Sequence, residues 1–209
     1  MVNYKLTYID GRGLGEATRQ VFHLAGVSFE DFRLTFGGKE FEEFKPKTPF
    51  GQFPVLNVDG FETPQSTAIL RYLARKFGYA GKTPEEEAWV DAIVDQFKDF
   101  LGTFREFVFA VILKKPAEEI ERIRKDIVNP ARDTYFKILT GILEKSKSGF
   151  LVGDNLTFAD LVVADNLYTL ETHGFIVKED HPRIVEYQTK IKNLPKLKEY
   201  LEKRPDHPF

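Results

Sequence analysis

The chain has 209 residues, enough to bury a sizeable hydrophobic core in one large domain or in two small domains packed together. Hydrophobic residues make up 42% of it and charged residues 30%, which is typical of a globular protein, while the formal net charge of −2 argues against a protein that tracks nucleic-acid phosphates. The longest apolar run, residues 107–113, falls far short of the roughly 20 residues that span a bilayer, and no signal-peptide pattern opens the chain, so we expect a cytoplasmic protein without a membrane partner. Because the chain has no cysteine, any sulfur chemistry must use sulfur that arrives on a ligand.

The first part of the chain alternates short strands with helices. Strands are indicated by apolar residues at every second position, and helices by apolar residues three or four positions apart. A glycine that can adopt a positive φ marks a tight turn between two further strands. These patterns predict strands near 4–8 and 29–34, helices near 14–25, 41–45 and 66–77, and a hairpin that turns at Val58-Asp59-Gly60.

Strand patterns disappear from Glu85 onward, and the rest of the chain is predicted to be helical. Capping residues and prolines introduce each segment. The predicted helices span 85–113, 117–145, 157–172, 182–192 and 195–203. We therefore expect an α+β protein whose boundary lies near 78–84, with a first domain at 1–80 and an all-helical second domain at 81–209.

The stretch YIDGRGLGE, residues 8–16, joins the first strand to the first helix. Its glycines do not satisfy the dinucleotide-binding pattern G-x-G-x-x-G, so they do not predict a phosphate loop. Tyr8 is the sharper candidate, because a phenol remains a hydrogen-bond donor at pH 7 and a donor aimed at a thiol stabilises the thiolate. Lowering a thiol pKa from about 8.5 to about 7 requires roughly 2 kcal/mol, which one charge-assisted bond supplies. From these residues alone, a core tyrosine that only packs is the favoured alternative.

Two later motifs combine turn chemistry with candidate binding groups. In FGQFPV, Pro54 is expected as the first residue of a strand, with a cis bond to Phe53 as one option and a simple loop end as the other. In TPQSTAIL, Gln65 and Ser66 fall on the first turn of a helix, where exposed N–H groups can hold a carboxylate. Helix capping by Ser66 explains the same residues equally well.

Other polar groups are expected to be structural. In GDNLTFADL, Thr157 and Asp160 form a capping box, so we assign Asp160 to helix nucleation and not to catalysis. Asp91, Asp95 and Asp99 share one helix face, but Lys98 stands beside them, which favours an exposed acidic stripe over a divalent-cation site. The four histidines lack metal-ligand spacing, and no metal is expected.

Several motifs in the same order resemble the glutathione transferase family, most closely its sigma class with the nematode sigma-like enzymes and the glutathione-dependent prostaglandin D synthases. The resemblance covers nearly the whole chain. It implies an α+β fold with a thioredoxin-like N-terminal domain followed by an all-α C-terminal domain, assembled as a homodimer. It is carried by NYKLTYIDGRG with Glu16, PFGQFPVLNVDG, QSTAILRYLA, VDAIVDQFKDF, LVGDNLTFADL and NLPKLKEYLEKRP.

The activity implied by this resemblance is conjugation of reduced glutathione to hydrophobic electrophiles in detoxification, together with peroxide reduction. Glutathione is then a co-substrate, and no permanently bound cofactor is expected. Two alternatives stay open on the same fold. One is a non-catalytic carrier of apolar ligands, and the other is a glutathione-dependent prostaglandin isomerase.

The resemblance also assigns roles to individual residues. Tyr8 is the catalytic donor to the glutathione sulfur, and Asp99 reaches the glutathione bound by the partner protomer. The implied glutathione-binding set is Tyr8, Phe41, Lys45, Gly51, Gln52, Phe53, cis-Pro54, Gln65, Ser66 and Asp99, in which Phe53 faces the cysteinyl part, Gln65 and Ser66 the γ-glutamyl carboxylate, and Phe41, Lys45 and Gln52 the glycyl end. The implied electrophile pocket draws on Gly13, Leu14, Phe104, Arg105 and Phe209.

Two positions depart from the vertebrate prostaglandin synthases. Leu14 stands where those enzymes have an arginine that supports the thiolate, and Glu106 stands where they have a pocket tryptophan. Lys98 weakens the magnesium site associated with them. These differences lower the expectation of isomerase activity, while Arg12 is retained and is expected to support the local structure.

Overall fold

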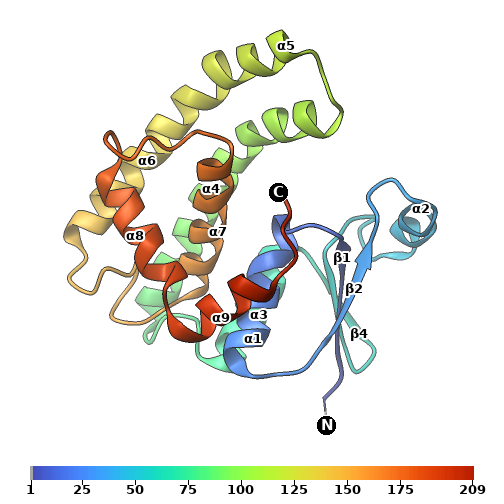
Figure 1. Cartoon of the computed structure of the whole chain (residues 1–209). Helices are drawn as coiled ribbons and strands as arrows, with labels where there is room; N and C mark the ends of the chain where they lie inside the picture. The colour runs from blue at the N-terminus through green and yellow to red at the C-terminus, as the bar shows by residue number, and fades with distance from the viewer. Residues whose placement is uncertain (1) are drawn as a thin grey trace. The chain divides into compact units, whose positions relative to one another are not determined.

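The computed structural model describes residues 2–209, which form two compact units (Figure 1). The first unit combines the chain up to Ala80 with the C-terminal segment Ile191–Phe209, and the second is Gly81–Lys190. Residues at the two ends of the sequence therefore pack in the same unit. Within residues 2–209, no helix has both the length and the apolar character needed to cross a bilayer.

The first unit is built on a four-stranded mixed sheet with the strand order β2-β1-β3-β4. β1 (Tyr4–Ile9) runs parallel to β2 (Glu30–Leu34), and β3 (Val55–Val58) is antiparallel to both β1 and β4 (Phe61–Pro64). The predicted hairpin is confirmed, since Asp59 and Gly60 both have positive φ values (49° and 95°) between β3 and β4. Pro54 lies one residue before β3, so the expectation that it begins the strand was wrong by one position.

Helices cover one side of this sheet. Along β1, every second side chain is buried, which turns Tyr4, Leu6 and Tyr8 inward. α1 (Glu16–Ala25) and α3 (Ser66–Phe77) pack against each other beside the strands, whereas α2 (Lys39–Phe44) lies on the other side (Figure 1). α9 (Pro195–Lys203) packs on α1, and the chain beyond it returns toward the end of β1.

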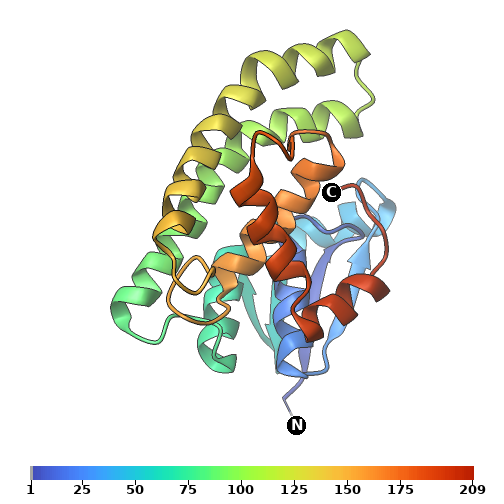
Figure 2. The ribbon, with the colours of Figure 1, turned by 60° about the vertical axis from the view of Figure 1, so that its left-hand side comes forward.

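The second unit is helical and contains α4 (Pro84–Ile112), α5 (Ala117–Arg122), α6 (Asn129–Lys145), α7 (Phe158–Thr172) and most of α8 (Pro182–Lys192). α4 and α6 run side by side (Figures 1 and 2). α7 is largely buried, and its Leu161, Val163, Leu167 and Leu170 are fully inaccessible. Aromatic rings also pack between α4 and α6, where Phe100 and Tyr135 stack with ring centroids 4.7 Å apart.

The helix expected at 117–145 is not continuous. A π-helical segment, Ile123–Val128, separates α5 from α6. The physical reason is Pro130, which has no N–H to donate to the carbonyl four residues earlier. The Asn129 N–H instead donates to the Arg124 carbonyl, a five-residue step, so a wider turn absorbs the missing bond.

Candidate functional site

Tyr8 lies near the end of β1, with only 7% of its surface exposed. Its hydroxyl oxygen accepts a hydrogen bond from the Leu14 N–H at 2.9 Å. A phenol has one proton and two lone pairs, so this bond uses a lone pair and leaves the proton on Tyr8 as a donor. Hydrogen bonds in series polarise one another, and accepting from Leu14 therefore makes the Tyr8 O–H a stronger donor.

Glycines make room for the Tyr8 ring. A Cβ at Gly13 would lie 2.6 Å from the Tyr8 hydroxyl oxygen, and a Cβ at Gly15 would lie 2.5 Å from Tyr8 Cδ1. Gly13 also has φ +38°, in the region that favours glycine. The glycines of YIDGRGLGE therefore set the close approach of the β1–α1 loop to Tyr8.

We expect Gly15→Ala to lower the melting temperature by forcing the Tyr8 ring to move. The backbone at Gly15 is ordinary (φ −89°), so the effect is steric, and overpacking of this kind costs about 1–3 kcal/mol. Gly141→Ala in α6 is the matched control, because nothing lies within 4 Å of its ideal Cβ and alanine stabilises a helix interior by roughly 0.5–1 kcal/mol over glycine. Thermal unfolding of both variants measures the difference, and similar melting temperatures would contradict the steric account.

The Phe53–Pro54 peptide bond is cis and directly precedes β3. Phe53 packs against the buried Phe41, with the ring centroids 5.4 Å apart. Lys45 Nζ lies 5.6 Å from the Phe41 ring centroid, within cation–π range. The structure thus gathers these residues of α2 and the loop before β3 at one place.

Gln65 occupies the N-cap position of α3 with an unusual backbone conformation (φ 73°, ψ 116°). Ser66 is the first helical residue, so the expectation that Ser66 caps the helix was wrong: Gln65 occupies the cap position, one residue earlier. The Gln65 Nε2 donates to Gln52 Oε1 at 3.2 Å, and the Gln52 N–H donates to Thr48 Oγ1 at 3.0 Å. Non-glycine residues with such φ values concentrate at binding sites, where the surroundings hold them.

A buried ion-pair network lies under the β1–α1 loop. Arg19 is 1% exposed and donates to the Gly11 carbonyl at 2.7 Å, to Glu16 at 3.3 Å and to both Asp31 oxygens at 3.0 Å. Glu16 in turn accepts from Arg204 at 2.6 Å. Burial alone raises the pKa of Glu16, but the charges of Arg204 and Arg19 outweigh it and hold the pKa below its ordinary value. The glutamate is therefore ionised at neutral pH.

Sequence reasoning did not identify Arg19 as part of this network. Arg19 lies on the same helix face as the core residue Phe22, three positions later, and this spacing was the available indication, because a buried charge requires partners. Arg12 was expected to support the local structure, and its side chain is 1% exposed. Its Nε donates to the His207 carbonyl at 2.9 Å and its Nη2 to the Pro208 carbonyl at 3.0 Å.

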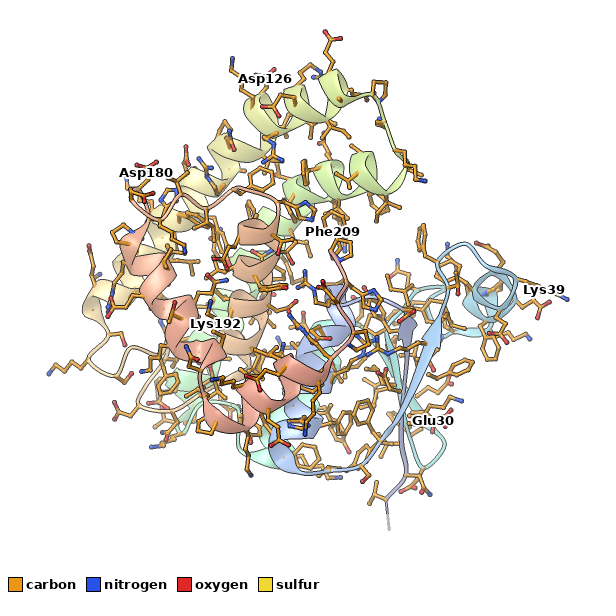
Figure 3. All side chains as sticks on the ribbon, in the orientation of Figure 1. Glu30, Lys39, Asp126, Asp180, Lys192 and Phe209 are labelled. Carbon is orange, nitrogen blue, oxygen red and sulfur yellow. The ribbon has the colours of Figure 1, made fainter. Side chains whose placement is uncertain are left out.

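The residues expected to form the electrophile pocket divide between the two units. Gly13, Leu14 and Phe209, the last of which is labelled in Figure 3, belong to the first unit. The Phe209 carbonyl accepts the Arg12 N–H at 2.8 Å. Phe104 belongs to α4 and is buried among other phenylalanine rings of the second unit. Arg105 is exposed on the same helix.

The acidic stripe on α4 is exposed and partly neutralised. Asp99 is exposed, and Lys98 Nζ lies 3.4 Å from Asp95 Oδ1. Among the residues that the structure describes, no group of three or more histidine, aspartate or glutamate side chains is arranged to hold a metal ion. Lys98 thus adds a positive charge to this face, as the sequence indicated.

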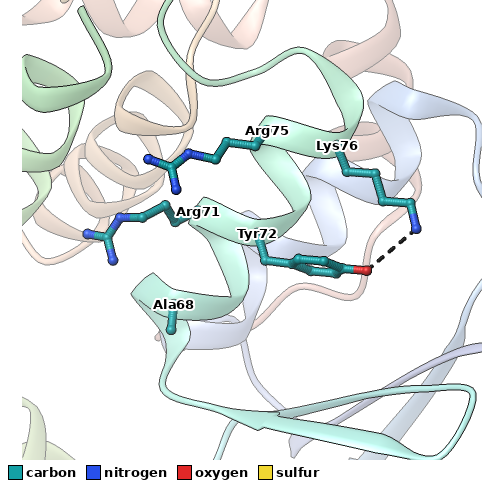
Figure 4. A pocket seen from close by; sticks show the side chains of 5 residues that line it. All are labelled: Ala68, Arg71, Tyr72, Arg75 and Lys76. Atoms are coloured by element: carbon teal, nitrogen blue, oxygen red, sulfur yellow. Dashed lines mark hydrogen bonds between the residues drawn. The ribbon is translucent and has the colours of Figure 1, made fainter. Parts of the chain in front are cut away.

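A shallow hollow of about 590 Å³ is lined by side chains of α3 (Figure 4). Its lining is Ala68, Arg71, Tyr72, Arg75 and Lys76. The Lys76 Nζ donates to the Tyr72 hydroxyl at 3.5 Å. None of the candidate glutathione residues lines this hollow.

Two family models match the chain. The model of the glutathione S-transferase N-terminal domain matches residues 4–75, and the model of the glutathione S-transferase C-terminal domain matches residues 98–204. Every candidate residue except Phe209 falls within one of these two ranges.

Similar proteins match over essentially the whole chain. Glutathione S-transferase 3 of Caenorhabditis elegans is 51% identical over 209 residues, which cover 100% of both chains. A nu-class glutathione S-transferase from Haemonchus contortus is 50% identical with a TM-score of 0.89 and covers 100% of both chains. Monomeric Na-GST-3, a glutathione S-transferase from the hookworm Necator americanus, is 43% identical with a TM-score of 0.92 over 99% of this chain and 100% of that one.

Proposed function

Since the chain belongs to the glutathione S-transferase family and is a transferase that conjugates glutathione, we propose that Tyr8 is the group that stabilises the glutathione thiolate. The observation that carries this proposal is the Leu14 N–H bond to the Tyr8 hydroxyl, which fixes the phenol and strengthens it as a donor. A donor that binds the thiolate more strongly than the thiol lowers the thiol pKa toward neutrality.

The reaction is nucleophilic attack by the glutathione sulfur on a hydrophobic electrophile. A carbon–sulfur bond forms from a sulfur lone pair, and the electrophile loses its leaving group or takes up the electron pair. The protein contributes proximity and an ionised sulfur. The chain's lack of cysteine is consistent with this chemistry, because the nucleophile belongs to the co-substrate.

In the proposed complex, domain 1–80 binds glutathione and domain 81–209 contributes the electrophile pocket. The γ-glutamyl carboxylate lies at the N-terminus of α3, where the helix dipole favours an anion beside Gln65 and Ser66. Phe53 offers backbone hydrogen bonds to the cysteinyl part, and the glycyl end lies among Phe41, Lys45, Gly51 and Gln52. The cluster around the Phe41 ring and the Gln52–Gln65 bond support this arrangement.

The same proposal assigns the chain to the sigma-like class of nematode enzymes, acting in the cytoplasm as a homodimer in which Asp99 reaches the partner's glutathione. Its support is the set of motifs quoted above and the exposure of Asp99. Leu14 and Glu106 argue against a prostaglandin isomerase, because an apolar side chain and an anion replace groups that such an enzyme uses. Lys98 argues against it as well, because it adds a cation to the acidic stripe where such an enzyme has a magnesium site.

Turnover with a panel of electrophiles tests the proposed function. Aryl halides, α,β-unsaturated aldehydes and organic hydroperoxides are assayed with reduced glutathione and, as control, with S-methylglutathione, which cannot form a thiolate. We expect conjugation only with reduced glutathione. Absence of turnover across all classes, together with tight binding of apolar ligands, would instead identify a carrier.

A second experiment tests the position of the γ-glutamyl carboxylate. Ser66→Ala removes a hydroxyl from the first turn of α3, and a hydrogen bond to a charged group contributes about 1.5–3 kcal/mol. We expect KM for glutathione to rise about tenfold or more while kcat changes little. Ser28→Ala, at an exposed loop position, is the control. An unchanged KM in Ser66→Ala would remove this residue from the glutathione site.

A further inference from the structure

The C-terminal strap, defined as residues 204–209, is attached to the β1–α1 loop mainly at Arg12, and His207 Nε2 also lies 3.2 Å from Asp10 Oδ1 of the same loop. Arg12 donates its Nε to the His207 carbonyl at 2.9 Å and its Nη2 to the Pro208 carbonyl at 3.0 Å, and its backbone N–H donates to the Phe209 carbonyl at 2.8 Å. Three consecutive carbonyls of the strap are thus held by one buried arginine. The planar guanidinium fixes two of them in a geometry that lysine cannot reproduce.

The beginning of the strap is attached to the same loop through ion pairs. Arg204 lies 2.6 Å from Glu16, and both side chains are almost completely buried. Glu16 also pairs with Arg19, whose Nη1 donates to the carbonyl of Gly11 at 2.7 Å. The strap therefore contacts the loop directly at Arg12 and Asp10, and indirectly through Glu16 and Arg19.

The loop held in this way carries the hydrogen bond to Tyr8. Leu14, two residues after Arg12, donates its N–H to the Tyr8 hydroxyl, and the Gly15 N–H donates to the Arg12 carbonyl at 3.2 Å. Arg19 Cζ lies 5.8 Å from the Tyr8 ring centroid. A displacement of Arg12 therefore moves the donor that fixes the Tyr8 phenol.

We propose that the C-terminal strap supports thiolate formation, with Arg12 as the positioning residue through which it acts. The strap holds Arg12, Arg12 holds the loop, and the loop presents the Leu14 N–H to Tyr8. This inference rests on the proposed role of Tyr8. It assigns to residues 207–209 an effect on the ionisation of glutathione, which differs from a role in binding the electrophile.

The test is a pH titration of the thiolate absorbance of protein-bound glutathione. The variants are Arg12→Gln, a truncation that removes residues 207–209, and the two changes combined. We expect each single change to raise the thiol pKa by about half a unit to one unit and to lower kcat/KM at pH 7 by about three- to tenfold. The loss in kcat/KM should shrink at alkaline pH, where the thiol ionises without help. The double variant should show no more than the larger single shift, because both changes break the same attachment.

Arg132→Gln is the matched control. Arg132 is a part-buried arginine that donates to a distant backbone carbonyl, that of Phe175 at 3.0 Å, but it lies in the second unit. The Arg132→Gln protein should be less stable than the wild type, whereas the thiol of its bound glutathione should keep the wild-type pKa. Removal of Phe209 alone, which deletes one of the three strap carbonyls, provides a milder change in case the larger truncation fails to fold.

Wild-type thiol pKa values in folded Arg12→Gln and truncated proteins would overturn the role of the strap and leave Tyr8 as the thiolate donor. Additive shifts in the double variant would also overturn it, since Arg12 would then act without the strap. Absence of thiolate absorbance in the wild-type complex would overturn the proposed role of Tyr8 itself, and with it the inference about the strap.

Discussion

Replacing Tyr8 with phenylalanine is expected to return the thiol pKa of bound glutathione from about 7 to about 8.5 and to lower kcat/KM at pH 7 by about 10- to 50-fold. The change removes the hydroxyl that we propose as the donor to the sulfur and leaves the ring between the glycines of the loop. The thiolate fraction at pH 7 then falls from about half to a few per cent. The measurements are the pH titration of thiolate absorbance in the binary complex and the pH profile of kcat/KM.

Tyr4→Phe is the control for the loss of a tyrosine hydroxyl. Tyr4 lies on the same strand and the same face of the sheet, and it is 6% exposed, compared with 7% for Tyr8. Its ring packs with Phe22 and lies under Lys76, away from the β1–α1 loop. Equal thiol pKa values in the Tyr8→Phe variant and the wild type would remove Tyr8 from the mechanism, whatever the effect on stability.

The effect expected for Tyr8→Phe depends on the residue at position 14, which is a leucine in this chain. An arginine side chain at this position would place a positive charge near the sulfur, whereas this chain offers the backbone N–H of Leu14. A neutral donor that acts through the phenol stabilises the thiolate less than a direct cation does. We therefore attribute most of the stabilisation to the Tyr8 O–H and expect no second side chain to replace it in the Tyr8→Phe variant.

Sequence patterns predicted the parts of the fold that depend on local periodicity and turn chemistry. Alternation along β1 placed Tyr8 on the buried face, and Asp59-Gly60 identified the hairpin. The cis bond before Val55 was recognised as an option because proline alone makes that conformation common. In each case the residues that determine the structure are close together in the sequence.

The remaining features depend on contacts between distant segments. The acceptors of Arg12 are backbone carbonyls about 195 residues away, and a backbone carbonyl has no signature in the sequence. The positive φ of Gln65 was not predicted either, because such a φ is typical of glycine or asparagine and the surroundings override that preference. The attachment of the β1–α1 loop to the distant end of the chain therefore required the structure.

Asp160 provides the second large expected effect, on stability instead of catalysis. Its buried carboxylate accepts hydrogen bonds from the Leu151 N–H (2.9 Å), the Thr157 N–H (2.9 Å), the Thr157 hydroxyl (3.0 Å) and the Tyr187 hydroxyl (3.0 Å). The capping box with Thr157 is present, which agrees with the structural role predicted from the sequence. Asp160→Ala leaves these donors buried without their acceptor, so we expect a loss of about 3–5 kcal/mol in the free energy of unfolding and a melting temperature lower by roughly 6–20 °C.

Asp154→Ala, at an exposed position of the same loop, is the control and should change stability by less than about 0.5 kcal/mol.

The pH dependence of the free energy of unfolding provides a second test of Asp160. Burial raises the pKa of Asp160, although its hydrogen bonds oppose that rise, so ionisation is harder in the folded than in the unfolded protein. Its contribution to stability is thus fully present below the unfolded pKa of about 3.8 and declines as the pH rises through the folded pKa. Denaturant unfolding between pH 3 and 8 should show that this decline is absent from Asp160→Ala, while conjugation per folded molecule stays near the wild-type rate. Loss of conjugation at an unchanged melting temperature would make Asp160 a participant in the reaction and contradict its assignment to the helix cap.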